Sequence, residues 1–339
     1  MTPTQAAAAK SAINASICAY QIHPKGWIND PFGPPTPPVL RTIQGPGDKY
    51  FYNVVPAYQD AVGFVDSAAN GYAPLFVSTG KDEINAALVG ALANGKLLVA
   101  LRGTIPPTFD NNDIFAWMAD WMNDADIPPA HWWVKKLPVP RDCRAETGFV
   151  DAMRSLWPGI AQMIQTVLAT HRCTGVVVTG HSKGAAMTFL AAQLIEAAFP
   201  QVAGAIEVHA FAPPPVGNKV FQTFYGSLGA TTHRYQVQND VVPFLPLWAE
   251  ADFFPFISFP ELWEELAWAG LIFGIADDTG GGYYAVGDFT YFDSNHQLVP
   301  GADVLTSAMP AVIAALKAEQ FSTVAAAHSA VSSYLPCFR

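Results

Sequence analysis

Short apolar runs alternate with helix-like segments through the middle of the chain. The run Gly175 to Thr179 is β-branched and has no polar face, which is typical of a central strand in a parallel sheet. Residues 205–211 and 234–237 have the same strand character, whereas residues 185–199 are rich in Ala and Leu and stop before Pro200, as a helix does. This β-α-β succession predicts an α/β fold, with a mostly parallel central sheet and helices on both faces.

A hairpin and a second helix are predicted upstream of these elements. Residues 86–92 and 96–101 are strand-like and flank Ala-Asn-Gly, which favours a tight turn. Residues 158–171 carry one apolar stripe at helical spacing, formed by Ile160, Met163, Ile164, Val167 and Leu168. Pro158 suits the first turn of a helix, where its missing N–H costs nothing, so we expect this helix to begin there.

Three segments depart from this alternation. Residues 31–47 are rich in Pro and Gly, and we expect residues 1–50 to form an irregular N-terminal extension. Residues 105–135 and 247–276 concentrate Trp, Phe and Leu; they are interpreted either as ordinary core helices or as mobile amphipathic cover over an apolar site. No repeat or long linker divides the chain, so we expect residues 1–339 to form a single domain.

Composition narrows the classes of function. Hydrophobic residues make up 51% of the chain and charged residues 14%, against about 25% in an average soluble domain, which excludes extensive disorder. The net charge of −10 argues against a nucleic-acid partner and disfavours purely electrostatic adhesion to anionic lipid, so any membrane contact is expected to be hydrophobic. No uncharged apolar run approaches the roughly 18 residues that span a bilayer, so no transmembrane segment is predicted.

The cysteines and the metal-binding patterns are uninformative. Cys18, Cys143, Cys173 and Cys337 form no C-x-x-C pair; Cys18 and Cys337 lie near opposite ends, where either a disulfide or two buried thiols would fit. The sequence contains neither a His-Glu-x-x-His motif nor a carboxylate loop of calcium spacing. We therefore expect no metal and no cofactor.

The most informative local pattern is Gly-His-Ser-Lys-Gly at residues 180–184, between the apolar strand and the Ala-rich helix. A sharp turn there presents the hydroxyl of Ser182 above the carboxyl edge of the sheet, and Gly on either side lets neighbouring backbone pass without a Cβ clash. The following helix N-terminus favours developing negative charge. The pattern predicts that Ser182 is a nucleophile; the alternative is a tight turn with an incidental Ser.

A serine nucleophile needs a base, and the base needs an orienting acid. In a strand-turn-helix context the usual chain order is Ser, Asp, His. Asp240 follows the strand-like residues 235–239 and is placed at the same sheet edge, although Asn239 and Asp240 would equally suit a cap or turn. Asp240 is therefore the candidate acid.

Four segments resemble, in order, the fungal-type (class 3) lipase family of the α/β-hydrolase superfamily, across about residues 80–335. They are VALRGT at 99–104, VVTGHSKG at 177–184, FAPPPVGN at 211–218 and NDVVPFLP at 239–246. The resemblance implies an α/β-hydrolase fold with Ser182 as nucleophile and Asp240 as triad acid. It also implies an oxyanion hole formed by the backbone N–H groups of Thr104 and Lys183.

The resemblance extends to two further segments. Gly148-Phe149 is similar to the family's Gly-Phe pair, but Glu146 stands where the family has a His; we expect this departure to affect packing rather than chemistry. Residues 115–120 resemble the family's lid helix, which makes residues 105–125 a candidate lid. Residues 247–276 would then be an apolar insertion that frames an acyl channel.

Two histidines follow Asp240. The spacing of His296 is similar to that in the smaller fungal enzymes, but His296 lies between strand-like runs and is predicted to occupy a solvated turn. His328 follows a predicted helix over 309–327 and opens an ending, His-x-x-x-x-x-Tyr-Leu, similar to that of longer family members. We take His328 as the base, with His296 as the alternative. His181 and His209 are interpreted as structural.

The resemblance implies a serine hydrolase that cleaves carboxylic esters of acyl lipids, as triacylglycerol lipases do, with transient contact at a lipid–water interface. A soluble-ester esterase, a phospholipase or a feruloyl esterase on the same fold is the main alternative. A non-catalytic lipid-binding protein, a peptidase and an acyltransferase are further ones. The family is extracellular, but the first residues lack a compact Leu-rich run, so a cytoplasmic location stays open.

Overall fold

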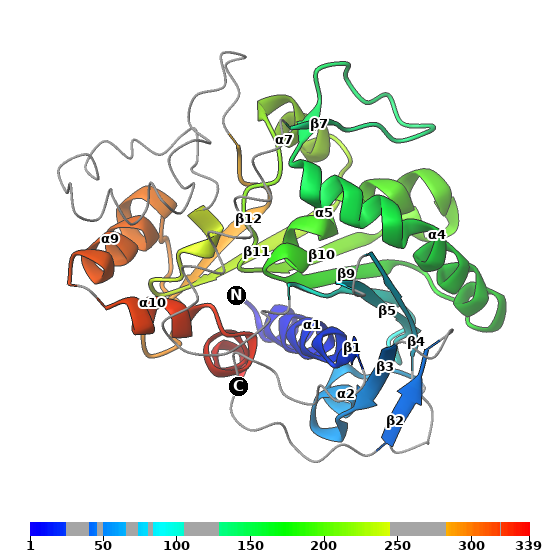
Figure 1. Cartoon of the computed structure of the whole chain (residues 1–339), viewed down its shortest axis with the longest axis horizontal. Coiled ribbons are helices and arrows are strands. Elements are labelled where there is room, and N and C mark those ends of the chain that lie inside the picture. The colour runs from blue at the N-terminus through cyan, green and yellow to red at the C-terminus, as the bar shows by residue number, and fades with distance from the viewer. Residues whose placement is uncertain are drawn as a thin grey trace.

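The computed structural model describes residues 1–24, 41–45, 50–65, 74–80, 84–104, 129–244, 283–318 and 320–339. Its main sheet has seven strands in the order β12-β11-β10-β9-β6-β5-β4 (Figure 1). The strands are β4 Leu75–Thr79, β5 Asn85–Ala91, β6 Leu97–Leu101, β9 Val176–His181, β10 Ile206–Phe211, β11 Thr231–Val237 and β12 Asp288–Phe292. Strands β6 and β9 to β12 pair in parallel, and β5 runs antiparallel to β4 and β6. The predicted mostly parallel sheet is confirmed.

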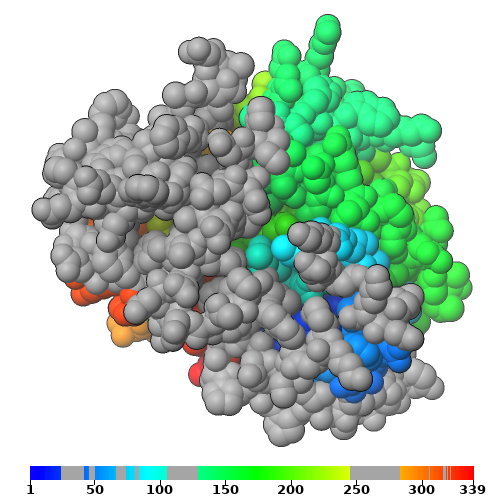
Figure 2. Space-filling model, in the orientation of Figure 1, coloured from blue at the N-terminus to red at the C-terminus, as the bar shows by residue number. Residues whose placement is uncertain are grey.

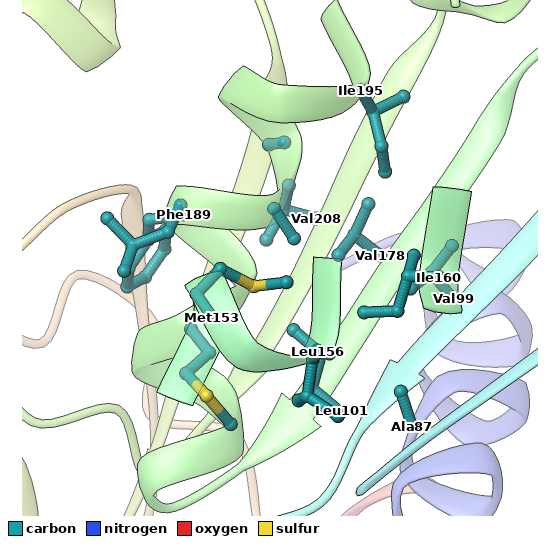
Figure 3. Packing of buried hydrophobic residues seen from close by; sticks show 14 of the residues in the cluster. Ala87, Val99, Leu101, Met153, Leu156, Ile160, Val178, Phe189, Ile195 and Val208 are labelled. Carbon is teal, nitrogen blue, oxygen red and sulfur yellow. The ribbon is translucent and has the colours of Figure 1, made fainter. Parts of the chain in front are cut away.

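Helices cover both faces of this sheet. The helices α4 (Thr147–Thr170) and α5 (Lys183–Ala198) pack on one face, and α1 (Pro3–Tyr20) packs on the other (Figure 1). Figure 3 shows how the side chains of α4 and α5 meet the sheet. The labelled contacts come from Met153, Leu156 and Ile160 of α4, Phe189 and Ile195 of α5, and Ala87, Val99, Leu101, Val178 and Val208 of the strands.

The alternation of side chains along the strands builds two cores. Val99 and Val178 lie in the core under α4 and α5, while their neighbours Leu98 and Val177 lie in the core with α1. Every residue of β9 is buried, which explains why this run has no polar face. Full burial of one Val or Leu side chain contributes roughly 1.5–3 kcal/mol.

The N-terminal region differs from the irregular extension expected for residues 1–50. Residues Pro3–Tyr20 form α1, which begins with a capping box in which Thr2 and Gln5 exchange hydrogen bonds. Nearly all of its second half is buried against the sheet and the C-terminal segment, so no polar face marks its period in the sequence. The strands β1 (Ile22–Pro24), β2 (Arg41–Gln44) and β3 (Tyr50–Val54) form a separate small sheet, and α2 (Pro56–Val62) follows.

Two predicted helix boundaries are wrong. Helix α4 begins at Thr147 rather than at Pro158, because the apolar stripe continues backward through Phe149, Val150 and Met153. Pro158 lies inside the helix at an exposed position, and packing of the buried face outweighs the roughly 3 kcal/mol that an interior Pro costs. The predicted helix over 309–327 is two helices, α9 (Met309–Lys317) and α10 (Phe321–Ala327).

Short elements complete the described chain. They are β7 Ala130–His131, β8 Arg144–Ala145, α6 Pro200–Ala203, α7 Lys219–Gly226, η2 Val242–Phe244, η5 Val304–Ala308, η6 Ala330–Tyr334 and η7 Leu335–Phe338. The candidate lid at 105–125 and the candidate apolar insertion at 247–276 lie outside the described residues. Among the helices that are described, none combines the length and the hydropathy that crossing a bilayer requires. All four cysteines are free thiols in the structure, including Cys18 and Cys337.

A charged network lies near the start of β10. Glu207 pairs with the ammonium of Lys96 and accepts a hydrogen bond of 2.9 Å from Nε2 of His209, whose Nδ1 lies 3.0 Å from the hydroxyl of Tyr235. The interpretation of His209 as a satisfied core histidine is therefore confirmed. The bond from His209, together with Lys96, lowers the pKa of Glu207 from 4.5 to about 2 even though burial acts in the opposite direction.

Replacing Glu207 by Gln is expected to make the free energy of unfolding depend less on pH in the acid range. Because the folded-state pKa is lowered, the carboxylate stabilises the native state above pH 4.5, and this contribution is lost as pH falls from 4.5 to about 2. Urea unfolding should show Glu207→Gln less stable than the parent by roughly 1–3 kcal/mol near neutral pH, with the difference vanishing toward the acid end.

The matched control is Glu196→Gln on α5, whose carboxylate has no hydrogen bond or ion pair within the described part of the chain. Its profile should parallel that of the parent. A Glu207→Gln offset that stays constant across the whole acid range would contradict the ion-pair account.

Candidate active site

Ser182 occupies the turn between the end of β9 and the start of α5. Its backbone has φ 60° and ψ −133°, a region that costs a non-glycine residue about 1–3 kcal/mol. Two backbone hydrogen bonds hold the turn: Ser182 N–H donates to the carbonyl of Phe211 at 2.9 Å, and Ala185 N–H donates to the carbonyl of Ser182 at 2.8 Å. The strained turn is therefore anchored both to the neighbouring strand and to the helix that follows.

Gly180 and Gly184 allow the backbone segments around this turn to approach closely. A Cβ on Gly180 would lie 2.3 Å from the carbonyl carbon of Gly184, and a Cβ on Gly184 would lie 2.2 Å from the carbonyl oxygen of Leu101 at the end of β6. Real Cβ atoms do not come this close to backbone, so only Gly fits at both positions. The two glycines join β9, α5 and the end of β6 at one point.

The structure brings His328 and Asp240 to Ser182. His328 caps the C-terminus of α10, and its Nε2 lies 2.9 Å from Ser182 Oγ. On the other side of the ring, Nδ1 lies 3.0 and 3.1 Å from the two carboxylate oxygens of Asp240, which follows β11. Ser182, His328 and Asp240 are 4%, 1% and 2% exposed, respectively. A continuous hydrogen-bonded path thus runs from hydroxyl to imidazole to carboxylate.

Two further donors hold the Asp240 carboxylate. The backbone N–H of Val242 donates to Oδ1 at 3.0 Å, and the hydroxyl of Tyr334 donates to Oδ2 at 2.6 Å. Burial, together with the negative charge of Asp240, raises the pKa of Tyr334 well above its ordinary value, so its proton stays on the phenol. In the sequence, Tyr334 is recognisable only as part of the ending that opens with His328, and its contact with Asp240 was not predicted.

His296 lies elsewhere, in the turn that follows β12. Its backbone has φ 59°, and its N–H donates to the carbonyl of Asp293 at 3.0 Å. Asp293 Oδ1 also accepts from the N–H groups of Asn295 and Gln297, which closes the turn. No hydrogen bond joins the ring of His296 to Ser182 or Asp240 in the described part of the chain.

His181 is buried behind the ring of His328. The two ring centroids are 4.7 Å apart, and Nδ1 of His181 lies 2.9 Å from the hydroxyl of Tyr20 on α1. Burial lowers the pKa of His181 well below its ordinary value, and the neighbouring His328 lowers it further, so this ring stays neutral. It supports the imidazole of His328 from behind, consistent with a structural role.

Thr104 and Lys183 lie on two segments that meet beside Ser182. Lys183 is the first residue of α5, and Thr104 follows the end of β6, whose Leu101 pairs with Gly180 of β9. Thr104 is buried, and its Oγ1 has no hydrogen-bond partner among the described residues. Backbone N–H groups at the start of a helix and at this strand end suit an anionic oxygen next to Ser182 Oγ.

Glu146 is the residue that caps α4. Its two carboxylate oxygens accept from the backbone N–H groups of Gly148 and Phe149, each at 2.7 Å. Burial raises its pKa, although these two donors and the positive charge of Lys183 act in the opposite direction. Lys183 in turn donates from Nζ to Asn85 Oδ1 at 3.1 Å. Glu146 therefore fixes the start of α4 and lies within electrostatic reach of the residue after Ser182.

A buried serine hydroxyl bonded to an imidazole, with a carboxylate behind the ring, is the arrangement that activates serine for attack on a carbonyl carbon. The imidazole accepts the hydroxyl proton, and the carboxylate stabilises the charged ring that results. Helix α5 directs its positive N-terminal dipole toward negative charge that develops next to Ser182. The site thus has the parts for acyl transfer by covalent catalysis.

Part of the chain is similar in sequence to known lipases. A family model described as "Lipase (class 3)" matches residues 98–250. Secreted mono- and diacylglycerol lipase A of Penicillium cyclopium is 34% identical over 106 residues, which cover 31% of this chain and 33% of that protein. Secreted mono- and diacylglycerol lipase 3 of Gibberella zeae is 28% identical over 112 residues, which cover 33% and 35%. Each match thus spans about a third of the relative's length.

Solved structures extend the likeness to most of the fold. A triacylglycerol lipase from Penicillium expansum superposes with a TM-score of 0.51 at 15% identity, over 86% of this chain and 81% of that one. A structure from a study of a buried polar cluster in a family of fungal lipases gives a TM-score of 0.50 at 20% identity, over 85% and 79%. The expected α/β-hydrolase fold is confirmed.

Adding a methyl group at either glycine of the turn is expected to destabilise the protein. Gly180→Ala and Gly184→Ala should each lower the free energy of unfolding by roughly 2–5 kcal/mol, because the new Cβ meets backbone atoms that cannot move independently. Urea unfolding followed by far-UV circular dichroism measures the change.

Gly226→Ala is the control for these variants. Gly226 ends α7, and a Cβ there meets nothing within 4 Å, so its effect should be neutral or stabilising by up to about 1 kcal/mol. If Gly184→Ala were as stable as Gly226→Ala, close backbone approach would not be what the turn requires.

Proposed function

We propose that the chain is a member of the class 3 lipase family and a serine hydrolase that cleaves carboxylic esters of acyl lipids. In this proposal Ser182 is the nucleophile, His328 the general base and Asp240 the acid that orients it. The observation that carries it is the hydrogen-bonded path from Ser182 Oγ through the ring of His328 to the Asp240 carboxylate.

The reaction begins with attack of Ser182 Oγ on the ester carbonyl carbon. His328 Nε2 takes the hydroxyl proton, while Nδ1–H stays bonded to Asp240, which stabilises the imidazolium. The tetrahedral intermediate collapses as Nε2 returns the proton to the departing alkoxide, which leaves as an alcohol. Water, deprotonated by the same nitrogen, then attacks the acyl carbonyl carbon; as this second intermediate collapses, Nε2 returns the proton to Ser182 Oγ, which releases the fatty acid and restores the free hydroxyl.

The oxyanion of each intermediate is assigned to the backbone N–H groups of Thr104 and Lys183. These residues lie on the two segments that Gly184 brings together, so the hole and the nucleophile are set by the same contact. One donor of this kind lowers the barrier by roughly 3 kcal/mol, about a hundredfold or more in rate. Hydrogen bonds from Tyr334 and the Val242 N–H hold the Asp240 carboxylate oriented toward the ring.

Acylglycerols are the proposed substrates. The two curated relatives are named as mono- and diacylglycerol lipases and one structural neighbour as a triacylglycerol lipase, which supports glycerol esters of fatty acids. The sequence is rich in Trp and Phe at 105–125, the candidate lid, and at 247–276, the candidate apolar insertion; both segments lie outside the described residues, and their composition suits a substrate with a long acyl chain. Transient contact with a lipid–water interface is expected for such substrates, because poorly water-soluble acyl lipids stay at the interface.

Alanine replacement of each downstream histidine tests the assignment of the base. With a soluble p-nitrophenyl ester as substrate, His328→Ala should lower kcat at least about a thousandfold, because Ser182 loses its proton acceptor. His296→Ala should keep kcat within about twofold, since its ring lies in the turn after β12. Both variants should retain the parent circular dichroism spectrum. The reverse pattern of losses would assign the base to His296 and contradict the proposal.

A further inference from the structure

A protruding hairpin joins β7 to β8. The two strands pair antiparallel, and Trp132 N–H donates to the carbonyl of Cys143 at 3.0 Å, which continues the pairing beyond the strand ends. Leu137 N–H then donates to the carbonyl of Val134 at 3.2 Å and turns the chain. The hairpin extends past α4 and α5 (Figure 1) and stands out from the surface in the space-filling view (Figure 2).

The inward side of this hairpin is fixed to the core. Trp132, Val134 and Cys143 are buried in the cluster that packs α4 and α5 against the sheet. The indole N–H of Trp132 donates to Gln193 Oε1 on α5 at 2.7 Å. Because side chains alternate along the extended chain, anchoring these residues directs their neighbours outward. The buried side chains, rather than the outward ones, therefore hold the hairpin in place.

The outward side combines an exposed indole with four basic residues. Trp133 is 59% exposed, although Trp132 beside it is only 1% exposed. The four basic side chains, all exposed, are Lys135, Lys136, Arg141 and Arg144. Residues 135–144 thus hold four of the chain's 18 Lys and Arg residues and one acidic residue, in a protein of net charge −10.

These charges face solvent with little local compensation. Within the described ranges, no ion pair joins any of the four basic side chains to a carboxylate. The nearby Arg154, by contrast, pairs with Asp151 on its own helix. At physiological salt, charges more than about 8 Å away are largely screened, so the hairpin presents a positive surface despite the acidity of the whole chain.

We propose that the outward side of the β7–β8 hairpin is a docking surface for anionic phospholipid. Trp133 would enter the headgroup region, where indole rings are favoured because one end is apolar and the other donates a hydrogen bond. The basic side chains around it would contact lipid phosphates. A lipid surface fits better than a nucleic acid, because the exposed indole of Trp133 and the exposed rings of Pro138 and Pro140 lie beside the basic side chains, whereas Leu137 and Val139 are half-buried against the core.

The place of the hairpin in the fold suits this role. Ala145 of β8 forms an isolated bridge with Gly217, in the segment that follows β10. The carboxyl ends of β9 and β10, and therefore Ser182, lie along the same edge of the sheet. Docking through the hairpin would hold this edge beside the lipid surface. The sequence predicted that any membrane contact would be hydrophobic. The hairpin would add an electrostatic contact to an aromatic one, and this binding would not depend on catalysis.

The test is co-sedimentation of the full chain carrying Ser182→Ala, so that vesicle lipid is not consumed. Partition into vesicles of phosphatidylcholine mixed with phosphatidylglycerol should exceed partition into phosphatidylcholine alone, and added salt should weaken it. Trp133→Ala and the double variant Lys135→Glu/Lys136→Glu should each reduce partition about tenfold or more. The charge-matched control Lys10→Glu/Arg172→Glu, at exposed sites on α1 and after α4, should change it less than twofold.

Three results would overturn the proposal. One is equal partition into neutral and anionic vesicles, and another is equal loss for the hairpin variant and its charge-matched control. The third is binding of a duplex oligonucleotide without binding of anionic vesicles. Hydrolysis of a soluble ester by the same hairpin variants with Ser182 intact should stay at the parent level. That readout separates failure of the docking surface from failure of the proposed ester hydrolysis.

Discussion

The arrangement of the site depends on one close contact of backbone with backbone. Because Gly180 and Gly184 carry no Cβ, the end of β9, the start of α5 and the end of β6 meet within van der Waals distance. Ser182 is held there with φ 60°, a conformation that costs energy and persists because strand and helix bonds fix it on both sides. The same contact brings the end of β6, which Thr104 follows, next to the start of α5 at Lys183, so the proposed oxyanion donors and the proposed nucleophile would be positioned together.

The imidazole reaches this turn from the far end of the chain. The C-terminal segment η6 and η7 packs against α1 and the sheet, where Phe338 meets the rings of Phe211 and Tyr235. His328, just before η6, is held between Ser182, Asp240 and the buried ring of His181. Helix α1 therefore contributes to the site indirectly, since it forms the surface on which the histidine-bearing segment rests.

Sequence reasoning succeeded where the chemistry is local. The turn at Ser182 and the strand before it follow from a single glycine pattern and one apolar run, whereas the preference for His328 over His296 needed a resemblance to other chains. Helix α1 was missed because its second half is buried on nearly all sides and shows no polar face. The start of α4 was misplaced because Pro158 suggested a first turn that the packing does not require. Tyr334 was missed as a partner of Asp240 because a hydrogen bond between residues far apart in the chain produces no recognisable sequence pattern.

The proposed chemistry depends on the Ser182 hydroxyl, which a strained backbone turn presents, and on the His328 ring beside it. The most direct measurement is reaction of the folded protein with a fluorophosphonate, followed by peptide mass spectrometry to locate the adduct. We expect one modification, on Ser182, formed rapidly in the parent and at least about a hundredfold more slowly when His328 is replaced by Ala. An unreactive protein, an adduct on another serine, or equal labelling rates in the two proteins would contradict the central claim.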